Sequence, residues 1–385
     1  MDIPELYRLS PLETAVGWVF GESEPIPERT DDARSPRQVL EEVILASLRR
    51  GPCGVSFSGG RDSSLVLAVA VHVARREGLP EPIPHTLRYP VAPDTEESDW
   101  QELVVRHLGI EQWERATIHD ELDLVGPYAT GMLLRHGPVW PAMAYTEIPA
   151  LEAFGGGSLL SGEGGDEVLG HSAHRIQPLA ALARSPMPVR RWRYQPALRA
   201  AAPSRVRAWW AARNLEESPW LKPAAVEYFR DWTAKDVAHE PLSWADSVRR
   251  IAGEPSGTVG EGTRLVVSAD YDVVSTSPLL HPEFVDALAR WGGWLGPGNR
   301  AETIRGIAGD LLPDAIIDRT SKAEFSRGFV TRYTAEFAQS WDGGGLDEQF
   351  VEPELVRREL LQDHPSAGVA QLLQAAWLAN HSGEA

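Results

Sequence analysis

The sequence predicts an α/β protein in which a mostly parallel sheet is flanked by helices and followed by a helical C-terminal region. Three observations lead to this fold class. Between residues 55 and 108 the hydrophobic pattern alternates as strand, helix, strand and helix. A further apolar run, 159–161, enters a glycine-rich segment, and from about residue 180 the pattern is helical. Such alternation is typical of a parallel sheet covered by helices.

The first 35 residues are too few for a domain of their own. Ser10-Pro11 and the acidic stretch 21–32, with its two prolines, predict loops, and residues 14–20 fit one strand. We therefore divide the chain into a short extension (1–35), a sheet-forming core (36–180) and a helical region (181–385).

The first helix of the core carries signals at both ends. Ser35 fits an N-cap and Pro36 the first helical position, apolar residues follow at helical spacing, and Gly51 fits the C-terminal end. The elements expected after it are a strand at 55–57, a turn at 58–60, a helix at 62–78, a strand at 84–89 and a helix at 95–108.

Composition excludes several classes of protein. Hydrophobic residues make up 43% of the 385 residues and charged residues 24%, which is ordinary for a globular protein. No apolar run reaches the roughly 18 residues of a membrane-spanning helix, and the first residues do not resemble a secretory signal. Cys53 is the only cysteine, so a disulfide scaffold is excluded and a cytoplasmic location is expected.

The charge balance argues against nucleic acid as a partner. The chain has 37 Lys and Arg against 55 Asp and Glu, which gives a formal net charge of −18. A protein of this charge repels a phosphate backbone, so we expect neither nucleic-acid nor membrane binding.

The segment Ser58-Gly59-Gly60-Arg61-Asp62-Ser63 carries the strongest functional signal. It follows a strand and opens a helix, where unpaired N–H groups and the helix dipole favour phosphate. Its two glycines allow close backbone approach, and Ser58 and Ser63 add hydroxyl donors. Asp62 repels phosphate directly, so we expect it to hold magnesium between its carboxylate and pyrophosphate oxygens. A simple glycine turn with a capping Asp is the competing interpretation.

Three motifs together resemble one family. Ser-Gly-Gly-x-Asp-Ser resembles the pyrophosphate loop of the N-type ATP pyrophosphatases, which cleave ATP to AMP and pyrophosphate. The segment 160–170, with Ser161-Gly162-Glu163-Gly164-Gly165-Asp166-Glu167, is similar to a motif in the synthetase domain of asparagine synthetase. Residues 318–326, with Lys322, resemble the segment of that family that ends in Lys-x-x-Phe-Ser. The resemblance covers about residues 36–380 and extends to β-lactam synthetases and lasso-peptide cyclases.

The resemblance implies a fold, cofactors and residue roles. The fold is the PP-loop, or adenine nucleotide alpha hydrolase-like, core, with residues 36–180 binding ATP and residues 181–385 completing the active site. Asp62 and Asp166 would hold Mg²⁺, Lys322 would stabilise the transition state, and Glu163 would take the proton of the amine. Alternatives are a surface lysine at Lys322 and helix N-terminal electrostatics at Glu163. Residues expected at the ATP or pyrophosphate are Ser56, Ser58, Gly59, Gly60, Asp62, Ser63, Leu87, Ser161 and Gly162.

The sequence also departs from the family pattern. Asparagine synthetase has a glutaminase domain with a cysteine after the initiator methionine, whereas position 2 is Asp2 and only about 35 residues precede the core. We therefore expect ammonia, a partner subunit or a substrate amine to supply nitrogen. Thr276 and His281 stand where the family has arginine and aspartate, so the carboxylate substrate is expected not to be aspartate. Because the glutaminase domain and these two substrate-side residues differ from asparagine synthetase, we expect a role in natural-product biosynthesis rather than in primary metabolism.

Some features have two interpretations. Arg61 points either to a phosphate or acidic substrate or to solvent. The arginine-rich segment 184–213 is either a solvated helical pair or a docking surface for an acidic carrier protein, acidic peptide or partner subunit. His171 and His174 lack zinc-ligand spacing and fit pocket-lining or surface positions.

The sequence thus predicts an ATP-dependent ligase that adenylates a carboxylate and couples it to ammonia or an amine. The alternatives are macrocyclisation of a peptide, tRNA modification, and a non-catalytic subunit of a larger synthetase. The net charge argues against tRNA, and retention of Asp62, Asp166 and Lys322 argues against a non-catalytic role.

Overall fold

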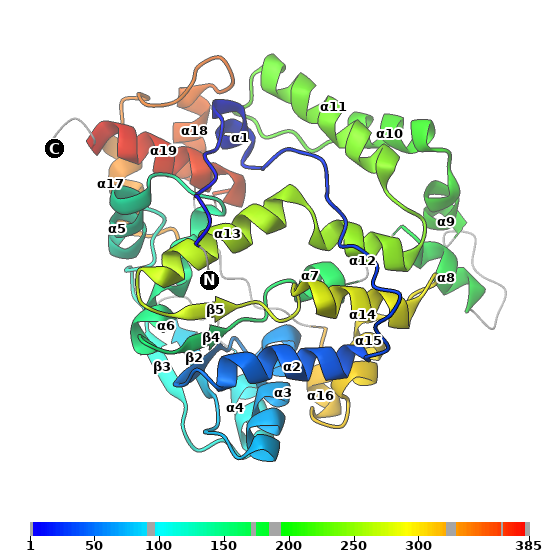
Figure 1. The fold of residues 1–385 in the computed structure, drawn as a ribbon. Helices are drawn as coiled ribbons and strands as arrows, with labels where there is room; N and C mark the ends of the chain where they lie inside the picture. Colours follow the sequence, from blue (N-terminus) through cyan, green and yellow to red (C-terminus); the bar gives the residue numbers. More distant parts are fainter. Residues whose placement is uncertain are drawn as a thin grey trace.

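A five-stranded parallel sheet forms the centre of the part of the chain described by the computed structural model (Figure 1). This part comprises residues 3–90, 97–170, 175–184, 194–320, 329–362 and 365–381. The strand order is β3-β2-β1-β4-β5, and all pairs are parallel. The strands are β1 (Cys53–Ser56), β2 (Ile83–Arg88), β3 (Glu114–Thr117), β4 (Ser158–Leu160) and β5 (Val274–Thr276).

Helices surround the sheet and make up the rest of the fold. Those that precede or connect the first four strands are α1 (Pro11–Val16), α2 (Pro36–Leu48), α3 (Arg61–Glu77), α4 (Ser98–Leu108), α5 (Pro127–His136), the 3₁₀ helix η2 (Ala142–Glu147) and α6 (Ile148–Ala153). Those between β4 and β5 are α7 (Gly165–Val168), α8 (Gln177–Ala183), α9 (Tyr194–Ala201), α10 (Ser204–Arg213), α11 (Pro223–His239), α12 (Trp244–Ala252) and α13 (Pro255–Ala269). Those after β5 are α14 (Pro282–Gly292), α15 (Arg300–Ala308), α16 (Asp314–Ile317), α17 (Arg332–Ser340), α18 (Pro353–Leu360), the 3₁₀ helix η5 (Ala367–Val369) and α19 (Ala370–His381).

The predicted fold class is confirmed, and local signals locate most of the core elements. Helix α2 begins as expected: Ser35 caps it and Pro36 is its first residue. Helix α3 ends at Gly78, which adopts the left-handed conformation, with φ 66°, that glycine tolerates. In Figure 1, α2, α3 and α4 lie below the sheet and α13 lies above it. The sheet is therefore covered on both faces, as expected for parallel strands.

Three local expectations were wrong. Residues 14–20 do not form a strand, because Ser10 and Glu13 make a reciprocal capping box that starts the helix α1. Strand β3 was missed because Glu-Arg-Ala-Thr is largely exposed and has no apolar pattern. Strand β5 lies within the region expected to be helical, and its three residues are too short a run to be recognised without their partner β4.

The sheet topology determines where a ligand can bind. The chain runs outward from β1 to β2 and β3 on one side, then returns to place β4 and β5 on the other. In open parallel sheets, ligands bind outside the carboxyl ends of the strands at such a switch point. Here that point lies between β1 and β4, which are followed by the two glycine-containing loops. The predicted domain boundary at residue 181 stays a prediction, although β5 comes from beyond it.

The largest apolar core lies around α3. Its residues Leu65, Val66 and Leu67 are fully buried, as is Val55 of β1. Each such side chain stabilises the fold by roughly 1.5–3 kcal/mol. Among the described helices, none has both the length and the apolar composition that crossing a bilayer requires.

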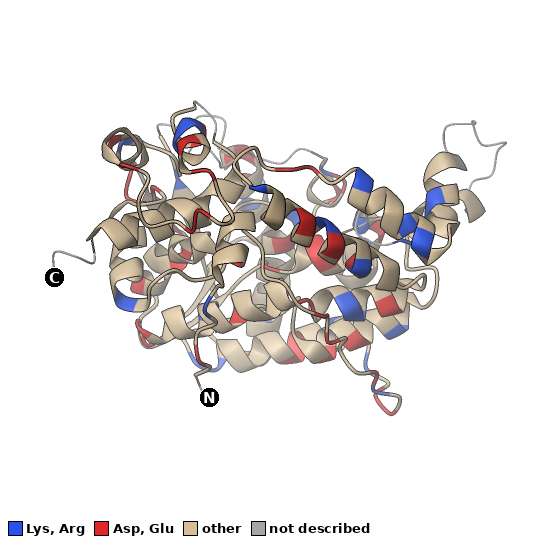
Figure 2. Cartoon of the chain, turned by 90° about the horizontal axis from the view of Figure 1, so that it is seen from above, with Lys and Arg blue, Asp and Glu red and all other residues tan. Residues whose placement is uncertain are grey.

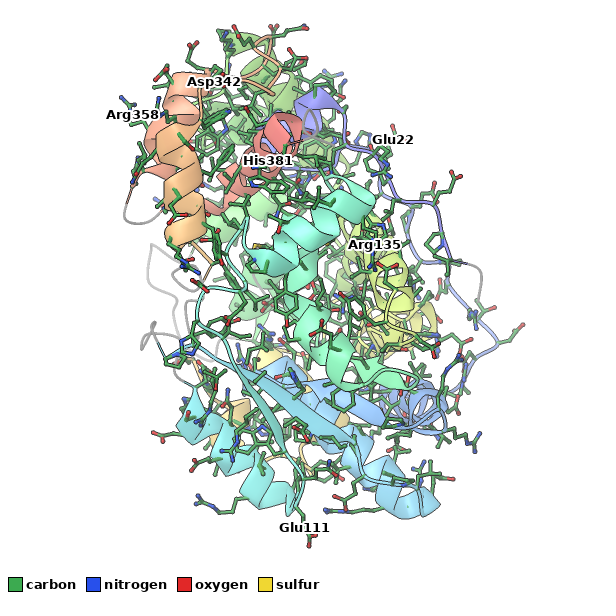
Figure 3. All side chains as sticks on the ribbon, turned by 90° about the vertical axis from the view of Figure 1, so that its left-hand side faces the viewer. Glu22, Glu111, Arg135, Asp342, Arg358 and His381 are labelled. Carbon is green, nitrogen blue, oxygen red and sulfur yellow. The ribbon has the colours of Figure 1, made fainter. Side chains whose placement is uncertain are left out.

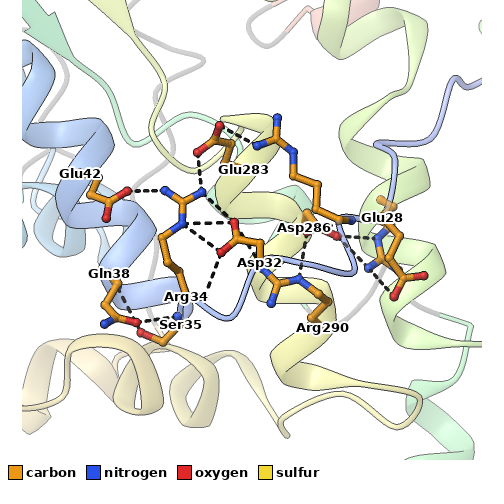
Figure 4. Close-up of polar contacts among 11 residues, drawn as sticks. Glu28, Asp32, Arg34, Ser35, Gln38, Glu42, Glu283, Asp286 and Arg290 are labelled. Carbon is orange, nitrogen blue, oxygen red and sulfur yellow. Dashed lines mark hydrogen bonds and ion pairs between the residues drawn. The ribbon is translucent and has the colours of Figure 1, made fainter.

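The segment between α1 and α2 is fastened to the helical region by ion pairs (Figure 4). Arg34 joins Asp32, Glu42 and Glu283, and the backbone N–H of Arg29 donates to Asp286 at 3.3 Å. Asp286 on α14 is 1% exposed and accepts from Arg249 of α12 and Arg290. This network holds the N-terminal segment across α12 and α14.

The C-terminal helices lie beyond one end of the sheet. Figure 3 shows Glu111, just before β3, at one end of the molecule and Asp342 and Arg358 near the other. Phe329 packs edge-on against Tyr89, directly after β2, with ring centroids 5.9 Å apart. Residues after the last strand therefore contribute to the surroundings of the strand ends.

Candidate active site

A cavity of about 440 Å³ opens at the carboxyl ends of β1 and β4. It brings together nine of the predicted site residues, which are the base Glu163 and eight residues expected to bind ligand or metal: Ser56, Ser58, Gly60, Asp62, Ser63, Ser161, Gly162 and Asp166. Leu87 lines an adjoining cavity, and Gly59 accepts a hydrogen bond through its carbonyl from Arg319 at 2.9 Å. Lys322 lies outside the described residues, although Thr320, two positions before it, lines the first cavity.

The loop after β1 is shaped by its two serines. The Ser63 hydroxyl accepts from the backbone N–H of Ser58 at 3.3 Å, and the hydroxyls of Ser58 and Ser63 lie 3.1 Å apart. Gly59 has φ 85°, a conformation that favours glycine. Helix α3 begins at Arg61 with no side-chain cap hydrogen bond. The arrangement leaves a turn and a helix N-terminus facing the cavity, which suits an anion such as phosphate.

The loop after β4 lies directly against the first loop. A Cβ at Gly162 would stand 2.7 Å from the backbone nitrogen of Ser63, and one at Gly165 would overlap the side chain of Asp62. Only glycine permits this approach. The two motifs recognised in the sequence are therefore one structural unit.

Asp62 and Asp166 meet at a single cationic group. Both carboxylates form ion pairs with the guanidinium of Arg300, at the start of α15. Burial raises the pKa of Asp62, while Arg300 opposes that rise. The Oδ1 atom of Asp62 is buried and has no hydrogen-bond partner. Carboxylates from two loops thus converge on the guanidinium of Arg300, and the Oδ1 atom of Asp62 is left without a hydrogen-bond partner.

These carboxylates fit a magnesium ion. Mg²⁺ is usually bound by one or two carboxylates together with substrate phosphates, rather than by a complete set of protein ligands. The described residues contain no group of three or more His, Cys, Asp or Glu side chains arranged to hold a metal. Asp62 and Asp166 are the side chains that would hold the ion.

Further arginines line this side of the cavity beside the carboxylates. Arg61, whose direction the sequence leaves open, lines the cavity. Arg319 is almost fully buried, pairs with Glu97, and lies over the ring of Trp100 at 4.8 Å. With Arg300, these groups surround the loop after β1. Arg300 belongs to no recognisable local motif. Arg319 lies within the segment 318–326 that resembles the family, but the sequence assigned no role to it.

The opposite side of the cavity is acidic. Arg264 of α13 lies 3.1 Å from Glu147 and 3.5 Å from Glu163, and its Nε atom lies 3.4 Å from Glu261. Its Nη1 also donates to the Ser161 hydroxyl at 2.6 Å. Burial raises the pKa of Glu147 and of Glu261, while Arg264 opposes the rise. We call Arg264, Glu147, Glu163 and Glu261 the Arg264 cluster.

Glu163 is the predicted base within this cluster. Its side chain is 56% exposed, whereas Arg264 is largely buried. Glu163 therefore faces the open cavity while its ion pair anchors it to α13. The sequence did not predict the other three members. Glu261 and Arg264 are three residues apart on one helix, so the sequence indicates that they are neighbours but not that they belong to a site. No local sequence signal connects Glu147 with them.

The adjoining cavity, about 240 Å³, is mainly apolar and aromatic. Phe57, Leu87, Tyr89, Ala150 and Phe329 contribute to it. His85 lines it too, and burial lowers the pKa of this imidazole, which favours the neutral ring. Ser56, Ser58 and Glu147 line both cavities. A flat apolar group and a polyanion joined to it match this pair of cavities.

The two positions that depart from the family pattern lie elsewhere. Thr276 and His281 line a separate cavity of about 650 Å³, together with Glu261 and Ser277. Ser277 donates to Glu261 at 2.8 Å, and its hydroxyl lies 3.2 Å from that of Ser161. The two sites are therefore connected through Ser277.

The arginine-rich segment divides into structural and exposed parts. Arg207 is buried and donates to backbone carbonyls of Val237 and Ala238, and Arg184 donates to Gly296. Arg199 and Arg213 lie over the rings of Trp210 and Trp209. In Figure 2, basic positions lie among acidic ones, and several basic segments occur on the helices at the right. Arg190, Arg191 and Arg193, like His171 and His174, lie outside the described residues. Docking of an acidic partner stays a prediction.

The fold and the cavities define a class: an α/β protein built to bind a nucleotide across the ends of a parallel sheet. Comparison with known families makes this specific. The model of a family described as asparagine synthase matches residues 37–380. The chain therefore belongs to the asparagine synthase family, whose members are ATP-dependent, amide-forming ligases that usually use Mg²⁺. No curated protein matches the chain.

Proposed function

We propose that the chain joins a carboxylate to an amine or ammonia by way of an acyl-adenylate. The observation that carries this proposal is the convergence of the two loops. One loop supplies a helix N-terminus and hydroxyls for pyrophosphate, and the other supplies a second carboxylate beside Asp62. This arrangement supports binding of Mg-ATP with its α-phosphate near the junction of the two cavities.

In the first step the substrate carboxylate oxygen attacks the α-phosphorus of ATP. The bond between the α-phosphorus and the bridging oxygen breaks, and pyrophosphate leaves. Ser58, Ser63 and the N-terminus of α3 hold the pyrophosphate, and Arg300 and Arg61 offset its growing charge. When bound at Asp62 and Asp166, Mg²⁺ neutralises phosphate charge. Lys322 is proposed to act at the same phosphates.

In the second step the amine nitrogen attacks the acyl carbon, the bond to the AMP oxygen breaks, and AMP leaves. Glu163 accepts a proton from the amine, because its carboxylate faces the cavity and is oriented by Arg264. The adjoining cavity, with Leu87 and neutral His85, would hold the adenosine. We propose a natural-product acid as the carboxylate, on the basis of Thr276 and His281.

Carboxylate-dependent exchange of ATP with pyrophosphate tests the proposal. Pools of amino acids, hydroxy acids and peptides are supplied with Mg²⁺, with and without added amine. Asp62→Asn is the inactive variant, and Asp99→Asn, an exposed carboxylate on α4, is the matched control. Exchange or AMP release with at least one pool, lost only in Asp62→Asn, is the expected result. Absence of Mg-ATP binding to the wild-type chain would overturn the proposal, and activity only with peptides would favour macrocyclisation.

A further inference from the structure

Glu147 occupies an unusual place for a carboxylate. It is the last residue of η2, immediately before α6, and it lines both the cavity of about 440 Å³ and the adjoining cavity of about 240 Å³. In the proposed acyl-adenylate, the α-phosphate and the acyl carbon, which are joined through an oxygen atom, would lie at the junction of these cavities. A carboxylate at that junction repels the phosphate, so its presence calls for a positively charged partner.

Arg264 is not sufficient as that partner. One guanidinium serves three carboxylates, those of Glu147, Glu163 and Glu261, and also donates to the Ser161 hydroxyl. With all four groups ionised, the Arg264 cluster carries two negative charges more than positive ones. The other arginines of the cavity, Arg61, Arg300 and Arg319, lie around the loop after β1, where Arg300 and Arg319 are paired with carboxylates of their own.

We propose that Glu147 selects a cationic nucleophile, a primary amine that arrives as its ammonium ion. This inference rests on the proposed function and specifies the class of its second substrate. The ammonium group would bind between Glu147 and Glu163, next to the acyl carbon. An amine that carries its own carboxylate close to the nitrogen, as an α-amino acid does, would be disfavoured, because Arg264 is already occupied by three carboxylates.

The proton balance is consistent with this assignment. The ammonium ion first gives a proton to the exposed Glu163 carboxylate, which passes it to solvent. The neutral nitrogen then attacks the acyl carbon, the bond to the AMP oxygen breaks, and the second proton leaves with AMP. Glu147, which is paired with Arg264, exchanges no proton in this sequence and holds the nitrogen in place, so it acts as a positioning residue.

Binding of a charged probe and its uncharged analogue tests the proposal directly. The probes are 4-fluorobenzylamine and 4-fluorobenzyl alcohol, followed by ¹⁹F NMR with the full-length chain. The wild type should bind the amine more tightly than the alcohol, and Glu147→Gln should weaken amine binding roughly 10- to 100-fold, the range expected for a hydrogen bond to a charged group. Alcohol binding should not change.

Two further variants keep the test decisive. Glu147→Asp retains the charge and should keep part of the preference for the amine, which also covers the case in which Glu147→Gln does not fold. Glu152→Gln, an exposed carboxylate on α6 that pairs with Tyr128, should behave as wild type. Equal affinity of the wild type for amine and alcohol, or an unchanged preference in folded Glu147 variants, would overturn the inference.

Exchange of ATP with pyrophosphate in the wild type separates this inference from the proposed function. If exchange occurs but the amine preference is absent, the inference alone fails. If the amine preference depends on Glu147 but no Mg-ATP binding is found, the proposed function alone fails.

Discussion

Arg300 is the residue on which the electrostatics around Asp62 and Asp166 depend. Its guanidinium pairs with both Asp62 and Asp166 and offsets part of the repulsion between these two carboxylates of adjoining loops. The proposed magnesium ion would bind the same two carboxylates, reaching Asp62 through its unpartnered Oδ1 as well, and Arg300 would then contact phosphate.

Replacing Arg300 with glutamine should make the fold depend on magnesium. Without the guanidinium, the repulsion between the two carboxylates should lower the free energy of unfolding by about 1–3 kcal/mol. Excess MgCl₂ should restore it in the variant and change the wild type much less. Urea unfolding with MgCl₂, or with NaCl at equal ionic strength as the control, measures this. A variant indifferent to Mg²⁺ would argue against the assignment of Asp62 and Asp166.

Gly162 decides whether the two loops can remain in contact. A Cβ there would stand 2.7 Å from the Ser63 backbone nitrogen, and backbone cannot move aside as a flexible side chain can. Gly162→Ala should abolish Mg-ATP binding in calorimetry and cost about 1–3 kcal/mol of stability. The control is Gly131→Ala on α5, where no atom lies within 4 Å of the new Cβ and a gain of about 0.5–1 kcal/mol is expected. Normal Mg-ATP binding by Gly162→Ala would show that loop contact is dispensable.

At the scale of elements, helices α12 and α14 are joined by a buried carboxylate. Asp286 is 1% exposed and is surrounded by Arg249, Arg290 and the backbone of the N-terminal segment. Asp286→Asn should cost about 3–5 kcal/mol, because two arginines lose their buried partner. Asp310→Asn, whose side chain is 69% exposed, should cost less than about 1 kcal/mol. Chemical unfolding compares the two, and equal losses would mean that burial of the network contributes nothing.

Helix α13 begins at a carboxylate that gives the fold a pH dependence. Burial raises the pKa of Glu254 to about 7 from 4.5, against the opposing charge of Arg250. The Glu254 carboxyl therefore binds its proton more tightly in the folded state than in the unfolded state. The contribution of this proton to the free energy of unfolding is fully present below pH 4.5 and is lost as the pH rises through 7. Glu254→Gln should remove up to about 3 kcal/mol of this loss. Unfolding curves at pH 5 and pH 7.5 measure it, and parallel behaviour of wild type and variant would contradict it.

At the scale of the whole molecule, charge limits the partners available. The formal net charge is −18, and the basic side chains inside the candidate site are enclosed by a cavity and by acidic neighbours. We expect no shift of tRNA in a native gel at physiological ionic strength, because the surface repels the phosphate backbone. A basic tRNA-binding protein run alongside is the control. A salt-sensitive shift would revive tRNA modification as a function.

The local sequence was sufficient for most features that depend on a few neighbouring residues. Ser35-Pro36 predicted the start of α2, the serine and glycine spacing predicted the loop after β1, and two separate motifs predicted Asp62 and Asp166. Caps, turns and loops are determined by contacts between residues a few positions apart, so the residues that predict them are close together in the sequence. The same logic failed at residues 14–20, where Glu13 formed a capping box that outweighed the apolar pattern.

Only the tertiary structure decided which distant residues share the site. Strand β5 exists because β4 offers it an edge, and Arg300, Arg264 and Glu147 reach the cavity from three elements that are far apart in the chain. Each of these charged side chains is unremarkable in sequence, because a charge acquires its role from the groups within a few ångströms of it. The sequence determined the family fold and the phosphate loop, whereas the folded chain determined the charge distribution across the cavity and hence the class of amine we propose.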